Sequence, residues 1–530
     1  MNYLDLYSSY PGHTITVAWD CQITEAAQVP WLKELLLRGG SELFPRFAVC
    51  YAELRVLPRS ARRALQRQIA RSSELAAIFP EWLQSEGRRE LQHKLARSLA
   101  GAALLLALGQ GLASAATITV TTNKPNIIAD GQCSLIEAIV NANNDAATHA
   151  DCAAGSGADT IVLPTATHKL TNVNNSTYYY GSTGLPWITS PITIQGNGAT
   201  IIRRGGAAFR LIAVESSGNL TLQNVTLKGG NSDYGGGILN HGTLTIQSST
   251  LSGNTASSGG GIANSGYGII TIENSTISGN TAQYVGGGVA NYCCGTLSIE
   301  NSTISKNSAS IWGGGVFSFG PLFIGNSTIS GNNAGYGAGV ANGGSAAIEN
   351  STISKNSANS YGYGGGVFNF SFYGNSNLTL TNSTISGNNA DQGGGVSNVS
   401  FFYENHSSLI IKNSLISGNK AGLGAEIDSS SSVVTGDNFN LFGANGNAGV
   451  TGFVPGLTDI VPARGVRLKN IVASLKNNGG PTQTHALASG SPALDAVSLL
   501  DPACAGTDQR GVVRPQGLGC DIGAFEKSGP

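Results

Sequence analysis

The sequence predicts an all-β fold, a right-handed parallel β-helix with capping modules, and three observations carry that prediction. One phrase, Asn-Ser-Thr-Ile-Ser-Gly-Asn, recurs with small changes at intervals of 24 to 32 residues. A second phrase, Gly-Gly-Gly followed by Ile or Val, travels in phase with it, and apolar residues alternate with polar ones between the two. A fixed period of this length indicates one structural unit stacked on itself. The first phrase starts at Ser248, Asn274, Asn301, Asn326, Asn350, Asn382 and Asn413.

A single repeat shows the expected strands. Leu297 and Ile299 alternate with a serine, which is the period-two pattern of a strand with one buried face. Gly, Asn and Ser fill the intervals and accept tight turns. We therefore expect three short strands per turn, around Leu-x-Ile, Thr-Ile-Ser and Gly-Val-x-Asn. The last Asn of each phrase should stack its amide on those of its neighbours, as in other stacked β structures; these are Asn280, Asn307, Asn332, Asn356 and Asn388.

The front of the chain has a different composition. Residues 1–115 carry 13 Lys+Arg and 10 Asp+Glu, against 17 and 21 in the rest. We expect residues 1–87 to be a helical leader, either cytoplasmic or the product of a misassigned start. Residues 88–115 combine a positive flank, a short apolar run and Ala-Ser-Ala, which is the pattern of a secretory signal. The run is too short to span a bilayer.

The signal predicts an exported protein cut after Ala115, with Ala113 and Ala115 as the small residues of the cleavage site. Cys133 and Cys152 lie close together in the exported part, as do Cys504 and Cys520. Export makes two disulfides plausible. The adjacent pair Cys293 and Cys294 is interpreted as turn residues.

The remaining boundaries follow from these signals. We expect an N-terminal cap at residues 116–158, β-helix repeats at 159–440 and a C-terminal module at 441–530. Stacked rods need caps because an open last turn exposes its apolar interior and unpaired strand edges.

Two motifs resemble known families. Cys133-Ser-Leu-Ile-Glu-Ala-Ile139 resembles the CSLREA signature that opens many secreted bacterial β-helix proteins, with Ile136 in the Arg place. The ordered set Gly490-Ser-Pro-Ala-Leu-Asp495, Asp508-Gln-Arg-Gly511, Arg514-Pro515 and Cys520-Asp-Ile-Gly-Ala-Phe-Glu526 looks like the choice-of-anchor Q domain. The repeats are similar to those of polymorphic outer-membrane proteins.

These resemblances imply a solenoid like that of the pectate lyases, secreted or held at a bacterial surface. They carry no defined reaction, so no catalytic residue and no cofactor is expected from them. The chain shows no apolar span after Glu526, and we expect no transmembrane helix.

Each Asn-Ser-Thr also matches the N-glycosylation pattern. The repeat itself explains these sites, because Asn closes a turn while Ser and Thr face outward on a strand. The structural interpretation is therefore preferred at Asn274, Asn301, Asn326, Asn350 and Asn382.

Function divides into two hypotheses. Parallel β-helices host polysaccharide lyases and glycosidases, which need carboxylates gathered in one groove. Glu273 and Glu300 hold matching places in consecutive repeats, with Lys306 and Lys355 nearby, but the pattern favours a solvated surface. Asp495, Asp501, Asp508 and Asp521 are interpreted as turn and cap carboxylates, with Arg510 and Arg514 as partners.

The preferred hypothesis is a non-enzymatic binding rod of the adhesin type. Several aromatic residues precede the Gly triplets by one to four positions and should line one edge of the rod. There they either contact a polysaccharide or a surface protein, or fill loops that cover the rod. The low, slightly acidic charge of the exported part argues against nucleic acid. The candidate contact residues are Trp312, Tyr336, Tyr361 and Tyr363, with Phe402 and Tyr403 further along the same edge.

Overall fold

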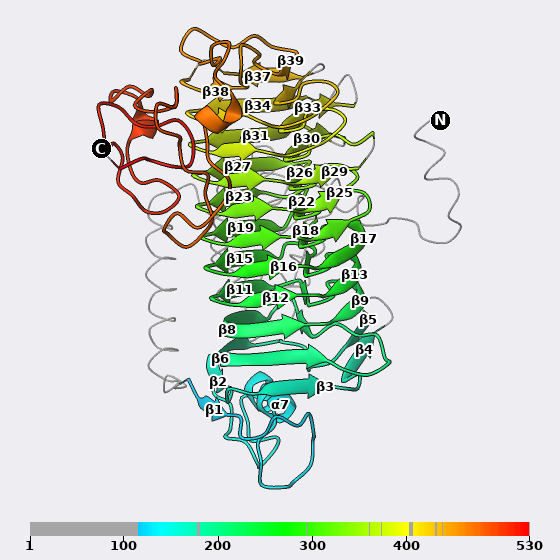
Figure 1. Cartoon of the computed structure of the whole chain (residues 1–530). Coiled ribbons are helices and arrows are strands. Elements are labelled where there is room, and N and C mark those ends of the chain that lie inside the picture. Colours follow the sequence, from blue (N-terminus) through cyan, green and yellow to red (C-terminus); the bar gives the residue numbers. More distant parts are fainter. Residues whose placement is uncertain are drawn as a thin grey trace, which may run out of the picture. The chain divides into compact units, whose positions relative to one another are not determined.

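The computed structural model describes residues 115–528, except 178–180, 293, 360, 373, 402–405, 430–431 and 437. The expected leader, and the expected signal up to residue 114, lie outside the described residues. The described part is a parallel β-helix of about nine turns, which confirms the predicted fold class (Figure 1).

One turn contains four strands and not the three expected from the sequence. In a central turn these are β15 (Ile269–Glu273), β16 (Thr276–Ser278), β17 (Thr281–Val285) and β18 (Val289–Asn291). The strand that the sequence missed is the third, at Thr281–Val285. Its inward residue in the repeated pattern is only an alanine, Ala282, so it lacks the alternation of large apolar residues that marks the others.

Strands of successive turns pair in parallel and form three sheets. The 21-stranded sheet contains the first two strands of each turn. Its first series is β1 (Thr117–Thr119), β2 (Asp159–Val162), β6 (Pro191–Arg203), β8 (Asn219–Lys228), β11 (Thr243–Gln247), β15, β19 (Thr296–Glu300), β23 (Leu322–Gly325), β27 (Ser345–Glu349), β31 (Ser376–Thr381), β34 (Ser407–Lys412) and β37 (Val433–Thr435). Its second series is β3 (Thr167–Leu170), β12 (Thr250–Ser252), β16, β20 (Thr303–Ser305), β24 (Thr328–Ser330), β28 (Thr352–Ser354), β32 (Thr384–Ser386), β35 (Leu415–Ile416) and β38 (Leu441–Phe442).

The third and fourth strands of each turn make the two smaller parallel sheets, and a separate hairpin is antiparallel. The six-stranded sheet is β9 (Asn231–Tyr234), β13 (Thr255–Ser258), β17, β21 (Ser308–Ala309), β25 (Asn333–Ala334) and β29 (Ser357–Ala358). The 10-stranded sheet is β7 (Ile212–Val214), β10 (Ile238–Asn240), β14 (Ile262–Asn264), β18, β22 (Val316–Ser318), β26 (Val340–Asn342), β30 (Val367–Ser371), β33 (Val396–Ser400), β36 (Ile427–Asp428) and β39 (Val450–Thr451). The hairpin is β4 (Asn175–Thr177) and β5 (Gly181–Thr183).

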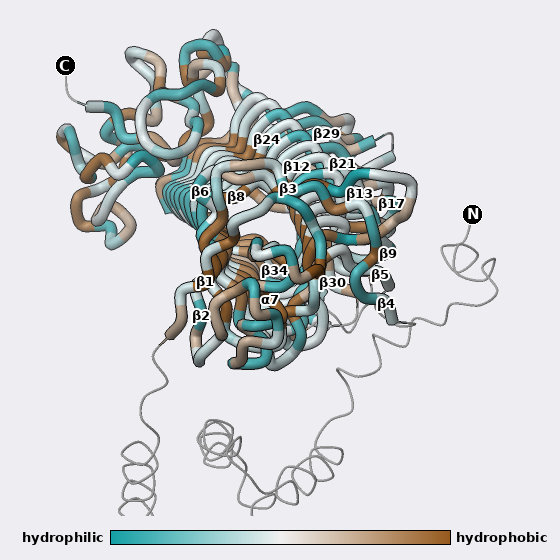
Figure 2. The backbone as a smooth tube through the Cα atoms, turned by 90° about the horizontal axis from the view of Figure 1, so that it is seen from below, coloured by the Kyte–Doolittle hydropathy of each residue, from teal (hydrophilic) through white to brown (hydrophobic). Residues whose placement is uncertain are grey.

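The interior is filled by columns of identical or similar apolar side chains. Ile270, Leu297 and Leu322 are register partners, and all three are buried. Seen along the rod, the turns superimpose and hydrophobic positions line the inside (Figure 2). Because the same position recurs in each turn, each apolar side chain packs on the equivalent side chains of the preceding and following turns.

Two ladders of buried asparagine follow the rod: the first, from Asn254 to Asn419, is the one that the sequence predicts, and the second is interrupted by Ser318. The Asn280 side chain accepts a hydrogen bond from the Asn254 amide group at 2.9 Å and donates to Asn307 at 3.0 Å. The second ladder ends the strands of the 10-stranded sheet, where Asn264 donates to Asn291 at 2.7 Å. Each amide satisfies polar groups that would otherwise lie unpaired in the interior.

The Gly triplets bend the chain between the two smaller sheets. Gly286 has a φ of 65°, in the left-handed region that glycine adopts freely. A Cβ on Gly287 would lie 2.4 Å from the carbonyl oxygen of Gly314 in the next turn. Glycine is therefore favoured in the triplet for two reasons: the turn needs a positive φ, and the backbones of successive turns lie too close for a Cβ.

Helix α7 (Leu135–Asn144) covers the N-terminal end of the rod and explains the Cys-Ser-Leu-Ile-Glu-Ala motif. Ser134 is its N-cap, and Ser134 and Glu137 form a capping box. Leu135, Ile136 and Ile139 are buried in the same core as the first strands. The bridge Cys133–Cys152 ties the start of the helix to the following loop.

The far end divides the expected module at 441–530 into two parts. Leu441, Phe442, Val450 and Phe453 continue the rod and pack on its last turns. Residues 461–528, here named the lateral module, lie against the side of the rod (Figures 1 and 2). The lateral module contains two 3-10 helices, Leu468–Asn470 and Pro502–Cys504.

The lateral module is held on the outer face of β24, β28, β32 and β35. Gln509 bridges two turns, because its side chain accepts from the Thr352 hydroxyl at 2.6 Å and donates to Thr328 at 3.0 Å. Leu415 takes the place that threonine holds in the previous turn, and the apolar core of the module packs on it. The outward column under the module is therefore threonine in three turns and becomes apolar at Leu415.

Candidate binding face

Aromatic side chains cover the outer side of the 10-stranded sheet over its central turns. The strands alternate, so Val316 and Ser318 point to the interior while Phe317 points outward. In neighbouring turns Ala290 and Ala341 hold the same place and leave room for the rings. We name this surface the aromatic face; it comprises Tyr292, Trp312, Phe317, Phe319, Tyr336, Tyr363, Phe368 and Phe370.

The rings contact one another in a continuous series. Trp312 stacks on Phe317, with centroids 5.9 Å apart and planes 10° from parallel. Tyr336 stacks on Tyr363 at 5.8 Å, and both contact Phe368 at 5.9 Å. Phe317 and Phe368 are 1% exposed, whereas Trp312, Tyr336 and Tyr363 are partly exposed. The phenylalanines thus form a base on which the tryptophan and tyrosines are held in fixed positions.

The structure brings together three of the four candidate contact residues. Trp312 and Tyr336 are bridge partners in consecutive turns, and Tyr363 follows in the next. Tyr361 is 83% exposed and packs against no other ring among the described residues. Phe402 and Tyr403 lie outside the described residues. Two phenylalanines of the base, Phe317 and Phe368, follow the Gly triplets at the place where other repeats carry Ala, and Phe370 lies two residues further along the strand.

Tyr292 links the aromatic face to Tyr234, which lies on its N-terminal side. Its ring lies 6.1 Å from Phe317 and 6.5 Å from Tyr234, edge to face in both cases. Burial raises the pKa of the Tyr292 phenol, so its hydroxyl stays protonated at neutral pH.

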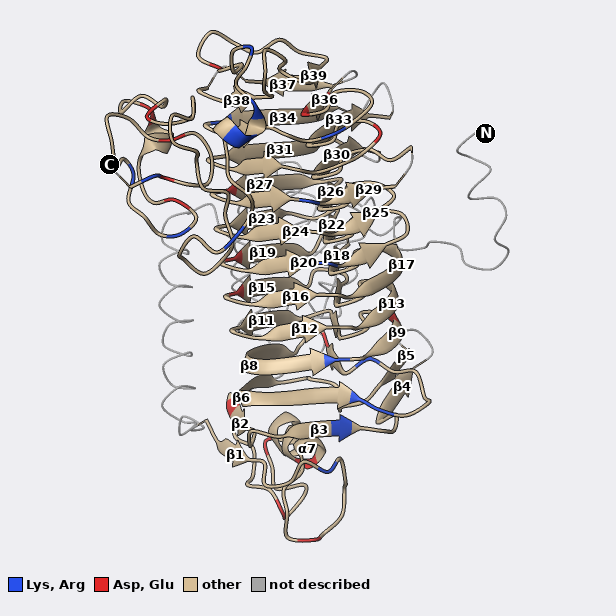
Figure 3. Ribbon diagram, in the orientation of Figure 1, with Lys and Arg blue, Asp and Glu red and all other residues tan. Residues whose placement is uncertain are grey.

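Glu273 and Glu300 are register partners in β15 and β19, as the sequence indicates, and they are among the few charges along the rod in Figure 3. The Glu273 carboxylate accepts from the Gln247 amide at 3.0 Å, and Gln247 accepts in turn from Gln223. Ser298 donates to Glu300 at 3.3 Å. Both side chains are partly exposed and continue a column of glutamines, which is the geometry of a solvated flank.

The Asn of each Asn-Ser-Thr closes a turn, as expected; Asn274 and Asn301 both have a φ of 49°. The prediction that the serine faces outward is wrong. Ser275 is 3% exposed, accepts from the backbone N–H of Ser249 at 3.1 Å and donates to the Glu273 carbonyl at 2.7 Å. Serine recurs at this place because its hydroxyl links consecutive turns.

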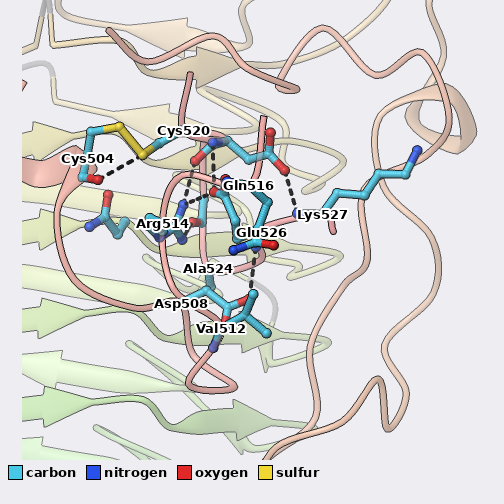
Figure 4. Close-up of polar contacts among 12 residues, drawn as sticks. Cys504, Asp508, Val512, Arg514, Gln516, Cys520, Ala524, Glu526 and Lys527 are labelled. Carbon is cyan, nitrogen blue, oxygen red and sulfur yellow. Dashed lines mark hydrogen bonds and ion pairs between the residues drawn. A yellow bond between two sulfur atoms is a disulfide. The ribbon is translucent and has the colours of Figure 1, made fainter. Parts of the chain in front are cut away.

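The carboxylates of the lateral module hold turns and caps, as interpreted, but one of the two expected arginine pairings differs (Figure 4). Arg510 pairs with Asp508 at 2.7 Å, whereas the partner of Arg514 is Glu526, at 2.9 Å. Asp501 caps a 3-10 helix. Among the described residues, no group of three or more His, Cys, Asp or Glu side chains could hold a metal ion.

Both expected disulfides are present, Cys133–Cys152 and Cys504–Cys520. Cys294 lies in a turn with a φ of 70°, as interpreted, and Cys293 lies outside the described residues. Of the cleavage-site residues, Ala115 is exposed and Ala113 lies outside the described range. No helix in the described part of the chain has the length and hydropathy to cross a membrane.

Sequence reasoning missed a groove beside β7, β10 and β14, at the N-terminal side of the aromatic face. Glu215, His241 and Tyr267 line it. These residues lie in turns before the first regular repeats or between strands, so no repeated phrase marks them.

Comparisons with known proteins give one similar solved structure, described as the crystal structure of pectate lyase Pel9A. The match has 13% sequence identity and a TM-score of 0.45, and it covers 79% of this chain and 98% of that chain. No family model matches the sequence, and no curated protein matches it. Membership of the families that the two end motifs and the repeats resemble therefore stays a prediction.

Proposed function

We propose that this protein is an exported, non-enzymatic binding rod whose aromatic face holds a polysaccharide. The observation that supports this most is the fixed row of Trp312, Tyr336 and Tyr363 in three consecutive turns, partly exposed above a buried phenylalanine base. Aromatic rings offer an apolar face and, in Tyr and Trp, a polar edge. A sugar ring offers the complementary combination of an apolar C–H face and hydroxyl groups.

The spacing of the row favours a ligand that itself repeats. Turns of the rod follow one another at the strand spacing of about 4.8 Å. A polymer that lies along the rod meets one ring after another, so each added contact strengthens binding. Tyr361, exposed two residues before Tyr363, is proposed as a further contact.

Two disulfides support the exported location, because such bonds persist in oxidising compartments and are rare in the cytosol. The secretory signal predicted at residues 88–115 supports the same location. We further propose that the protein acts at or outside the cell surface of a bacterium.

Binding without cleavage is preferred over a carbohydrate-active enzyme because of the surroundings of the two glutamates. Glu273 and Glu300 follow each other along one flank and hydrogen-bond to Gln247 and Ser298. A glycosidase needs two carboxylates on opposite sides of the bond that it cuts. A row of glutamates on one column does not provide that arrangement.

The experiment is retention of the purified exported chain on immobilised polysaccharides, with simultaneous assay for new reducing or unsaturated ends. Trp312→Ala and Tyr363→Ala should each weaken retention about fivefold, the equivalent of about 1 kcal/mol for a lost ring contact. Leu518→Ala, at a site 91% exposed in the lateral module, is the matched control and should change nothing.

Two outcomes would contradict the proposal. New chain ends that disappear in Glu273→Gln or Glu300→Gln would establish the enzyme hypothesis instead. Equal retention of the Trp312 variant, the Tyr363 variant and the control would remove the aromatic face as the binding surface. Circular dichroism of each variant must match the parent, so that lost retention is not lost folding.

A further inference from the structure

The groove beside the aromatic face is lined by residues from three consecutive turns of the rod. Its volume is about 370 Å³. Glu215 comes from the turn after β7, His241 from the turn after β10, and Ser265 and Tyr267 from the turn after β14. Tyr267 is 79% exposed and Ile269 is 48% exposed, so the groove has one apolar wall open to solvent.

The register of the sheet sets the polar groups in a line. Val214, Asn240 and Asn264 are partners across three strands. The next residue in each turn is Glu215, His241 and Ser265, so these follow one another along the rod at the strand spacing of about 4.8 Å. A carboxyl, an imidazole and a hydroxyl are thereby presented side by side to one ligand.

The lining offers hydrogen-bonding side chains and no cationic one. Burial raises the pKa of Glu215, and burial together with the nearby Arg210 lowers the pKa of His241. No lysine or arginine lines the groove. Among the described residues, none donates a hydrogen bond to the Glu215 carboxyl, which leaves its oxygens available to a ligand. An acidic ligand would meet a carboxyl and no cation to balance it.

We propose that this groove binds a neutral sugar residue, with Glu215 and His241 exchanging hydrogen bonds with its hydroxyls and Tyr267 covering its apolar face. The proposal rests on the proposed function, that the rod binds polysaccharide, and names a second subsite and the class of polymer. Neutral polymers are selected over acidic ones because the groove offers no cationic side chain.

The groove and the aromatic face belong to one track. Asn264 and Asn291 are register partners, so Tyr292 holds in the next turn the place that Ser265 holds in the groove. The Tyr292 ring contacts Phe317 of the aromatic face at 6.1 Å. A single chain that lies parallel to the rod axis therefore reaches both, and a longer oligomer should bind more tightly than a short one.

The test measures binding of a short cello-oligosaccharide, a long one and polygalacturonate by calorimetry, using the full exported chain. The long neutral oligomer should bind most tightly. Tyr267→Ala and Glu215→Ala should each weaken its binding about fivefold, an effect typical of one lost aromatic contact or hydrogen bond. Glu215→Gln should stay within about twofold of the parent, because an amide also exchanges hydrogen bonds with sugar hydroxyls. Leu500→Ala, at a site 93% exposed, is the control.

Each alternative result is distinct. If Trp312→Ala weakens binding while Tyr267→Ala and Glu215→Ala do not, the groove is no subsite and the proposed function stands. If Glu215→Gln weakens binding as much as Glu215→Ala, or polygalacturonate binds more tightly than the neutral oligomers, the neutral class is wrong. If the parent binds none of the probes, both proposals fail for these polymers.

Discussion

Removing one amide from the first asparagine ladder should destabilise the rod far more than its size suggests. Asn307 is 1% exposed and makes four hydrogen bonds through its side chain. Its oxygen accepts from the backbone N–H and the side-chain amide of Asn280, both at 3.0 Å. Its nitrogen donates to the Ile277 carbonyl at 2.9 Å and to Asn332 at 3.1 Å.

The change Asn307→Ala leaves two buried donors of Asn280 without an acceptor. Each unsatisfied buried donor costs about 1–3 kcal/mol, so the free energy of unfolding should fall by about 2–6 kcal/mol. The change Asn307→Asp keeps the acceptor but sets a carboxylate oxygen against the Ile277 carbonyl and the Asn332 oxygen. It should therefore be at least as destabilising at neutral pH.

The assay is urea unfolding followed by circular dichroism, with amide hydrogen exchange at Asn280 as the local probe, since stacked repeats can open in segments. The control is Asn333→Ala, an exposed neighbour whose side chain donates to the Ser357 carbonyl at 3.0 Å. Its cost should not exceed about 0.5 kcal/mol. If Asn307→Ala and Asn333→Ala cost the same, the ladder contributes nothing specific and the reasoning is refuted.

Three further predictions concern the ends of the rod and the lateral module. Burial raises the pKa of Glu426 from 4.5 to about 7, so the folded protein binds this proton more tightly than the unfolded chain does. The free energy of unfolding should therefore fall by about 3 kcal/mol as the pH rises from 4.5 to 7. In Glu426→Gln, urea unfolding at several pH values should show a smaller dependence of this free energy on pH. Replacing Cys133 and Cys152 by Ala should cost about 3 kcal/mol, and an unchanged melting temperature would argue against the bond. Gln509→Ala should make the lateral module more open to proteolysis while the rod stays resistant, whereas equal cleavage of both parts would show that the module is not held through this residue.

The interior of the rod is readable from the sequence because every contact repeats. Leu297 and Ile299 alternate with polar residues, which predicts a half-buried strand. The same pattern one period later predicts the strand that pairs with it in the next turn. The ladder that includes Asn280 and Asn307 follows from stacking identical residues. The third strand of the turn was not predicted because its core residue, Ala282, is too small to stand out from a turn.

The burial of Ser275 shows a different limit of prediction from the sequence. A polar residue beside a turn is expected to face water, and in this rod it is 3% exposed. Its hydroxyl is satisfied by backbone groups of two turns, at 3.1 Å and 2.7 Å. Only the position of the neighbouring turn reveals that an inward serine has both a donor and an acceptor available.

The candidate site was partly predictable. The aromatic residues next to the Gly triplets were expected to line one edge, and Trp312, Tyr336 and Tyr363 do so. The sequence could not show that Phe317 and Phe368 are buried while other aromatics are exposed. An outward residue of a strand has the same alternating sequence pattern whether or not other rings cover it.

What the sequence determined by itself is the part of the structure that repeats: the coil, its apolar columns and its asparagine ladders, since each depends on residues one period apart. The tertiary structure alone decided where the lateral module rests, because the bond between Thr352 and Gln509 joins residues 157 positions apart and occurs once. The same holds for the groove of Glu215 and His241, which exists because the parallel register sets two unrelated turns one strand spacing apart.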